Sequence, residues 1–190
     1  MAENIAEKKK AILESTLKLI QQNGFHGTPM SLVAKEAGVA AGTIYHYFDS
    51  KDTLILELFA YTQRQMQLTL QQGLHPEMDF EESFFLRWIN RCQFYIDHPE
   101  VLFFLEQFVN SPFYPRCTQQ SDHYQNEIKE FIELGNQHGI LRDMPPKLMA
   151  MMIHSSIMTA AKVHITGKAH LSEKEFTQLA QMNWDGIRKL

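Results

Sequence analysis

The feature that most constrains the fold is a short segment, residues 24–51, which reads GFHGTPMSLVAKEAGVAAGTIYHYFDSK. Thr28 can cap a helix with its hydroxyl, and Pro29 suits the first helical position because it has no N–H to satisfy. Gly38 permits the left-handed backbone that ends a helix, and a second short helix is predicted over about residues 41–48. Two helices joined so tightly predict a helix-turn-helix.

The second helix has an apolar and a polar face when its residues are placed about 100° apart around the axis. The apolar side holds Ile44, Phe48, Ala41 and, less squarely, Tyr47. The opposite side holds Gly42 and His46, flanked by Thr43 and Tyr45. Such a face suits close backbone approach and hydrogen bonds to phosphates and base edges. The alternative is a three-helix cap whose aromatic side chains are simply packed.

The next helix is expected to add a phosphate-binding group. Ser50 can cap this helix, and Lys51 in its first turn places a cation beside backbone N–H donors. Lysines also cluster at residues 8–10, on an expected first helix. They either meet the DNA backbone or form an ordinary solvated helix end.

These residues resemble a known family. The chain resembles the TetR family of one-component bacterial repressors. The residues that carry the resemblance are Gly24-Phe25, Thr28, Ala34, Ala37-Gly38-Val39, Gly42 to Phe48 and Ser50-Lys51. The resemblance covers roughly the first third of the chain. It implies that phosphates are held by Thr28, Tyr45, Tyr47 and Lys51, and that the major groove is met by Ala41, Gly42, Thr43 and His46. Position 41 is often basic or a hydroxyl residue in relatives, whereas Ala41 offers only a methyl group, for example to thymine.

The charge distribution is consistent with two functions. Residues 1–51 hold 6 Lys/Arg and 5 Asp/Glu, net +1, and residues 52–190 hold 12 and 17, net −5, which together give −4. We therefore expect a DNA-binding domain at residues 1–51, with its helix-turn-helix at about 29–48, and a regulatory domain for ligand binding and dimerisation at residues 52–190. DNA binding should weaken as salt rises, because counterions compete for the phosphates.

The whole chain is predicted to be all-α, with about nine helices. Helix-compatible sequence is almost continuous after Lys51, with no alternating strand pattern. Asp79 and the Ser172/Glu175 pair predict helix starts. No apolar run approaches the ~20 residues that span a bilayer, and the N-terminus lacks an apolar signal core, so we expect a cytoplasmic protein that does not enter the membrane. Cys92 and Cys117 lack metal-site spacing, although a redox role for them is an open alternative.

The central helices are rich in aromatic residues, which predicts an apolar cavity for a small hydrophobic or aromatic effector. Most individual rings are equally compatible with plain core packing. Glu106 lies between aromatic residues and could neutralise a lipophilic cation, or face water. The full set of candidate ligand-binding residues is Trp88, Phe104, Glu106, Phe108, Tyr124, His154 and Met158.

The last two helices carry apolar stripes that a small domain need not bury internally, which predicts a homodimer. The expected interface residues are Ile153, Ile157, Ala161, Phe176, Leu179, Ala180, Asn183 and Ile187. A two-fold dimer presents two recognition helices to half-sites about 34–36 Å apart. The alternative is an internal core without a partner.

These observations and the resemblance favour a ligand-responsive transcriptional repressor that binds a palindromic operator in double-stranded DNA as a dimer. We expect no enzymatic activity, no cofactor and no metal, because no HExxH pair, phosphate loop or nucleophile elbow occurs. Two alternatives stay open: an α-helical metal-dependent enzyme using some of the nine histidines, and a DNA-binding protein without ligand control.

Overall fold

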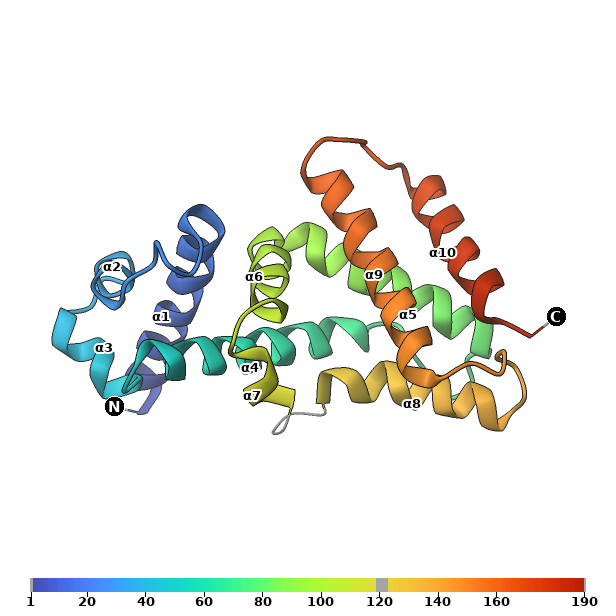
Figure 1. Cartoon of the computed structure of the whole chain (residues 1–190), viewed down its shortest axis with the longest axis horizontal. Helices are drawn as coiled ribbons and strands as arrows, with labels where there is room; N and C mark the ends of the chain where they lie inside the picture. The colour runs from blue at the N-terminus through green and yellow to red at the C-terminus, as the bar shows by residue number, and fades with distance from the viewer. Residues whose placement is uncertain (1, 119–122, 190) are drawn as a thin grey trace. The chain divides into compact units, whose positions relative to one another are not determined.

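The computed structural model describes the backbone of residues 2–118 and 123–189 and the side chains of residues 6–116 and 127–189. Within these ranges the chain folds into ten helices, with no strand beyond one isolated bridge between Leu141 and Arg188 (Figure 1). The helices are α1 (Ala2–Asn23), α2 (Met30–Glu36), α3 (Ala41–Tyr47), α4 (Lys51–Leu70), α5 (Phe80–Asp97), α6 (Pro99–Val109), α7 (Tyr114–Thr118), α8 (His123–Gln137), α9 (Pro146–Ile165) and α10 (Glu173–Ile187). The all-α prediction is confirmed, with ten helices in the described ranges where about nine were predicted.

Packing divides the chain into two compact units. The first unit comprises Met1–Arg64 and Glu100–Gln120, and the second comprises Gln65–Pro99 and Ser121–Leu190. The first unit therefore includes α6 and α7 together with the N-terminal helices, while α4 contributes to both. The predicted functional division into residues 1–51 and 52–190 stays a prediction.

Helix starts follow the local signals in the sequence. The Thr53 N–H donates to the Ser50 hydroxyl at 3.1 Å, as expected for a cap of α4. Asp79 accepts hydrogen bonds from the N–H groups of Glu81 and Glu82. Ser172 and Glu175 form the reciprocal capping box at the start of α10. These caps satisfy backbone donors that a helix leaves without an internal partner, which is why short polar motifs fix the boundaries.

The core of the first unit is built from one apolar side of each N-terminal helix. Ile12 and Ile20 of α1, Val33 of α2, Ile44 of α3 and Leu58 of α4 are all fully buried. A helix that buries one side must present the other to solvent. This packing therefore fixes which residues of α3 face outward.

The second unit packs around α5. The Trp88 indole N–H donates to the Ser156 hydroxyl at 3.2 Å, which links α5 to α9. The Phe80 ring stacks on the Phe131 ring of α8, with 4.2 Å between the ring centroids. Among the described helices, α9 alone is long and apolar enough to pass a length-and-composition test for a membrane span. That test is weak evidence for one helix, since helices of water-soluble cores also pass it. Only 28% of the apolar window in α9 is buried inside the chain.

Candidate DNA interface

The turn between α2 and α3 holds the two helices in a fixed relation. The Gly38 N–H donates to the Lys35 carbonyl at 3.2 Å, and the Val39 N–H donates to the Ala34 carbonyl at 2.9 Å. This pair of bonds is the Schellman pattern, which requires a left-handed residue, and Gly38 has φ +66°. The helix-turn-helix predicted from the Gly38 signal is present.

The outward face of α3 is close to the one predicted. Tyr45 is 53% exposed, Gly42 and His46 are exposed, and Thr43 and Tyr47 are half-buried. Ala41, which the angular argument placed on the apolar side, is exposed instead and is the first residue of α3. A Cβ added at Gly42 would meet nothing within 4 Å, so no intramolecular contact requires a glycine there. The face therefore offers a phenol, an imidazole and accessible backbone to an external surface.

Thr28 does not cap α2, contrary to one of its two predicted roles. The residue preceding α2 is Pro29, and no side chain caps this helix, so the predicted hydroxyl cap is wrong. Thr28 is 2% exposed, and its hydroxyl donates to the Gly24 carbonyl at 2.8 Å. A buried, already bonded hydroxyl stabilises its own loop, and a phosphate contact by Thr28 would require that bond to be exchanged.

Phe25 connects the helix-turn-helix to α6, a link that the sequence analysis missed. The Phe25 N–H donates to the Gln107 side chain at 3.3 Å, and the Phe25 carbonyl accepts a hydrogen bond from the Lys51 ammonium. The Phe25 ring contacts Phe104 edge-on at 5.8 Å between centroids and Phe113 at 6.2 Å. These residues are far apart in sequence, and no local pattern pairs them.

Lys51 therefore has a structural partner as well as its predicted DNA role. Partial burial lowers the pKa of its ammonium from the ordinary value of 10.5. An ammonium carries three donors, so one bond to a carbonyl leaves others for a phosphate oxygen.

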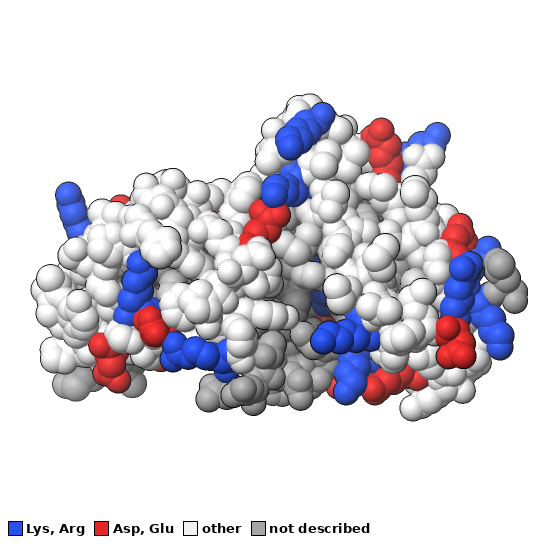
Figure 2. Space-filling model, viewed as in Figure 1, with Lys and Arg blue, Asp and Glu red and all other residues white. Residues whose placement is uncertain are grey.

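Charge near the interface is modest. Figure 2 shows blue and red groups intermixed over largely uncharged surface, with no continuous basic patch on the face in view. Lys9 forms an ion pair with Glu57 and lies 5.5 Å from the Phe48 ring centroid, while Lys10 lies 3.7 Å from Glu14. Lys8 is exposed. Of the three clustered lysines, Lys9 is thus the one engaged in holding α1 to α4.

The candidate ligand-binding residues do not line one described cavity. Phe104 and Phe108 are fully buried in the first unit, where Phe108 stacks on Phe59 at 4.4 Å, so both are core residues. Glu106 is half-buried in the same unit. Tyr124 lies outside the residues whose side chains are described. In the second unit, a cavity of about 30 Å³ is lined by Phe84, Arg87, Trp88, Arg91, Glu127, Ile128, Phe131, Ile153 and Ile157.

His154 and Met158 are half-buried on α9 and are not among the residues lining that cavity. Burial and the nearby positive charge of Arg91 lower the pKa of His154 from 6.5 to about 3. The imidazole is therefore neutral near pH 7, a state in which it can donate one hydrogen bond. A role for His154 in effector binding stays a prediction.

The expected dimer residues fall into a buried group and a group that lines a surface groove. Ile153, Ile157, Ala161 and Ala180 are at most 5% exposed inside the second unit, because they pack α9 and α10 onto the chain's own core. Phe176 is half-buried and packs against the His164 ring at 5.4 Å. The remaining three residues, Leu179, Asn183 and Ile187, line a groove of about 700 Å³ on α9 and α10.

This groove is rich in methionine. Met144, Met152 and Met182 line it and are well exposed, and Ser155, Thr159 and Gly186 allow close approach by another backbone. Two further apolar side chains on α9, Leu148 and Met151, are also more than half exposed. Helix periodicity could not tell this face from the buried one, because both faces of α9 are apolar.

Metal and thiol chemistry find no support among the described residues. No group of three or more His, Cys, Asp or Glu side chains is placed there to hold a metal ion. Burial raises the pKa of the Cys92 thiol to about 12, so the reactive thiolate is suppressed. Cys117 lies outside the residues whose side chains are described.

Comparison with known proteins agrees with this geometry. Residues 12–58 match the family described as bacterial regulatory proteins, tetR family, and residues 59–189 match the family described as tetracyclin repressor-like, C-terminal domain. An uncharacterised HTH-type transcriptional regulator from Haemophilus influenzae is 27% identical over 182 residues, 94% of each chain. Several further curated relatives align over only about 40% of their own length or less.

Solved structures share the whole fold. A TetR family transcription regulator from Marinobacter aquaeolei VT8 superposes with a TM-score of 0.92 over 100% of both chains at 21% identity. The regulator FadR from Bacillus subtilis, solved in complex with stearoyl-CoA, has a TM-score of 0.75 over 93% of this chain and 95% of its own at 20% identity. The two family matches together cover nearly the entire sequence, and the second alone covers more than half of it. The chain belongs to the TetR family of transcriptional regulators.

Proposed function

We propose that this regulator is a repressor that binds a near-palindromic operator as a homodimer and is released by a small apolar effector. The observation that carries the proposal is the exposed face of α3, where Gly42, Tyr45 and His46 stand on a helix held from behind by Ile44 and Phe48. A short helix presented in this way fits the major groove of DNA.

Dimerisation is supported by the apolar groove on α9 and α10. A monomer that leaves so many methionine side chains exposed on one face gains stability by covering them. Dimeric helix-turn-helix proteins read half-sites about 34–36 Å apart, so an operator with that half-site spacing is expected. The modest charge of the DNA-binding region gives a single head weak affinity, so pairing the heads is expected to be necessary for specific binding.

Effector control is supported by the cavity between α5, α8 and α9. Its volume of about 30 Å³ is too small for an effector molecule, so an effector must open it. The chain passes from this unit into the first through α4 and through the α5–α6 junction, and α6 holds the helix-turn-helix through Gln107 and Phe25. A nearly complete switch requires the effector to favour the released state by about 5.5 kcal/mol.

Selection of binding sites from a random duplex library tests the DNA-binding part of the proposal. The expected motif is an inverted repeat, and Tyr45→Ala should weaken binding to it in a fluorescence-anisotropy titration. Lys51→Met should also lower the salt slope by about one counterion, because a phosphate contact is lost. The matched control is Lys168→Met, which removes an exposed lysine from the α9–α10 loop and should leave the slope unchanged.

Thermal melts of each variant separate a folding defect from a lost contact, since Lys51 also bonds to Phe25. A selected motif without internal symmetry would contradict binding of the operator by a homodimer. Unchanged affinity and salt slope in both Tyr45→Ala and Lys51→Met would contradict the assignment of the interface. A reporter carrying the selected motif downstream of a promoter then tests repression in cells.

A further inference from the structure

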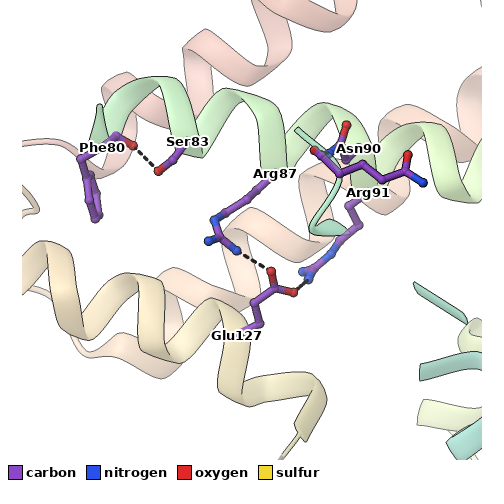
Figure 3. Close-up of polar contacts among 7 residues, drawn as sticks. Phe80, Ser83, Arg87, Asn90, Arg91 and Glu127 are labelled. Atoms are coloured by element: carbon purple, nitrogen blue, oxygen red, sulfur yellow. Dashed lines mark hydrogen bonds and ion pairs between the residues drawn. The ribbon is translucent and has the colours of Figure 1, made fainter. Parts of the chain in front are cut away.

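The cavity of the second unit contains an ion cluster at one wall. Arg87 and Arg91 are one helical turn apart on α5, and Figure 3 shows both side chains pointing toward Glu127 of α8. Arg87 Nη1 pairs with Glu127 Oε1, and Arg91 Nη2 lies 3.4 Å from Glu127 Oε2. Each oxygen of one carboxylate therefore faces a different guanidinium group.

The cluster is embedded in apolar surroundings. The other cavity-lining residues are Phe84, Trp88, Ile128, Phe131, Ile153 and Ile157, and the Arg91 side chain is only 5% exposed. The Arg87 guanidinium also lies 5.9 Å from the centroid of the Phe131 ring, and its buried Nε has no hydrogen-bond partner among the described residues. Burying the Arg91 guanidinium in such an environment costs free energy unless an anion compensates it, whereas the Arg87 side chain is one-third exposed.

We propose that this cavity binds an effector with an apolar body and a carboxylate head, and that the head takes the place of Glu127 on Arg87 and Arg91. Glu127 then acts as an internal stand-in for the effector's carboxylate. Carboxylate is the favoured head because a carboxylate already fits between the two guanidinium groups, which bind such planar anions well. The apolar residues lining the cavity would contact the body.

Displacing Glu127 would remove the ion pairs that join α8 to α5 at this point, and the cavity would expand to hold the ligand. The effect on DNA rests on the proposed repressor function, whereas ligand binding can be measured without DNA. Ligand binding at this cavity and release of DNA by the ligand can therefore be contradicted independently of each other.

Isothermal titration calorimetry with matched ligands tests the chemistry of the head group. The probes are octanoate, octanol, octylamine and octyl phosphate, with the decyl series covering a longer body. Octanoate or decanoate should bind about tenfold or more tightly than the corresponding alcohol, the usual consequence of hydrogen bonds to a charged group. Equal binding of acid and alcohol, preference for the amine or tighter binding of the phosphate would overturn the proposal.

Variants separate a ligand site from a purely structural ion pair. Glu127→Gln removes the internal competitor and should raise the affinity for the alkanoate, while Arg87→Gln should reduce the preference for the alkanoate over the alcohol. Arg142→Gln, outside the cavity, is the control for loss of one cation. If neither the wild-type protein nor Glu127→Gln binds any alkanoate, the proposal is wrong.

The double variant Arg87→Gln/Glu127→Gln retains amide groups at both positions and guards against misfolding of either single variant. It should melt cooperatively and prefer acid over alcohol less strongly than Glu127→Gln does, because only Arg91 remains to hold the carboxylate. A preference as strong in the folded double variant as in Glu127→Gln would place the anion away from Arg87. Alkanoate binding with these variant effects but without DNA release would support the ligand site and contradict effector control.

Discussion

Substituting Met182 with Asp should separate the proposed dimer. Met182 is 70% exposed in the single chain and lines the α9–α10 groove. Burying a whole Met side chain is worth about 1.5–3 kcal/mol, so covering the exposed part contributes roughly 1–2 kcal/mol per copy. A symmetric interface counts the residue twice, which gives roughly 2–4 kcal/mol, or about a 30- to 700-fold change in the dimer dissociation constant. The two buried carboxylates add a desolvation cost, so this range is a lower bound.

Sedimentation velocity over a dilution series measures the dissociation constant directly. The matched control is Leu68→Asp, which introduces the same charge at an apolar residue that is 71% exposed and lies outside the groove. We expect Met182→Asp to be monomeric at concentrations where the wild-type protein and Leu68→Asp are dimeric. If Met182→Asp associates as tightly as the wild type, or if Leu68→Asp dissociates equally, the groove is not the dimer surface and the reasoning fails.

Three further predictions concern single groups. The pKa of His154 is lowered to about 3 in the folded protein. Below about pH 6.5 the unfolded chain therefore binds a proton that the folded chain does not, so the free energy of unfolding decreases as the pH is lowered. Between pH 7 and pH 5 the loss should be about 2 kcal/mol in urea titrations and absent in His154→Gln; an equal loss in both proteins would contradict the shift. Gly38→Ala should cost roughly 1–2 kcal/mol because φ is +66°, whereas Gly42→Ala should leave the melting temperature unchanged or raised while weakening DNA binding; the opposite order would refute both assignments. Cys92 should resist alkylation at pH 8 in the native protein and react after denaturation, as peptide mapping would show; native-state labelling would contradict its burial.

Short sequence signals correctly predicted the structural features that depend on interactions between residues close in the sequence. A left-handed glycine, a serine cap and an apolar spacing act within a few residues, so the turn at Gly38, the starts of α4 and α10 and the buried Ile44 could be predicted from the chain alone. The same holds for the outward face of α3, apart from Ala41, because a helix has only one way to bury Ile44 and Phe48.

An all-α chain with a helix-turn-helix near its start follows from the amino-acid sequence alone, because those features depend on backbone conformation and short-range periodicity. Which apolar faces are already buried depends instead on how distant helices pack against one another. Ile153 and Ile157 turned out to be internal, and the exposed groove is lined by Met152 and Met182 instead. Contacts such as those of Phe25 with Gln107, or Arg87 with Glu127, join residues distant in the sequence. Their free energy depends on burial and mutual geometry, which no local pattern contains.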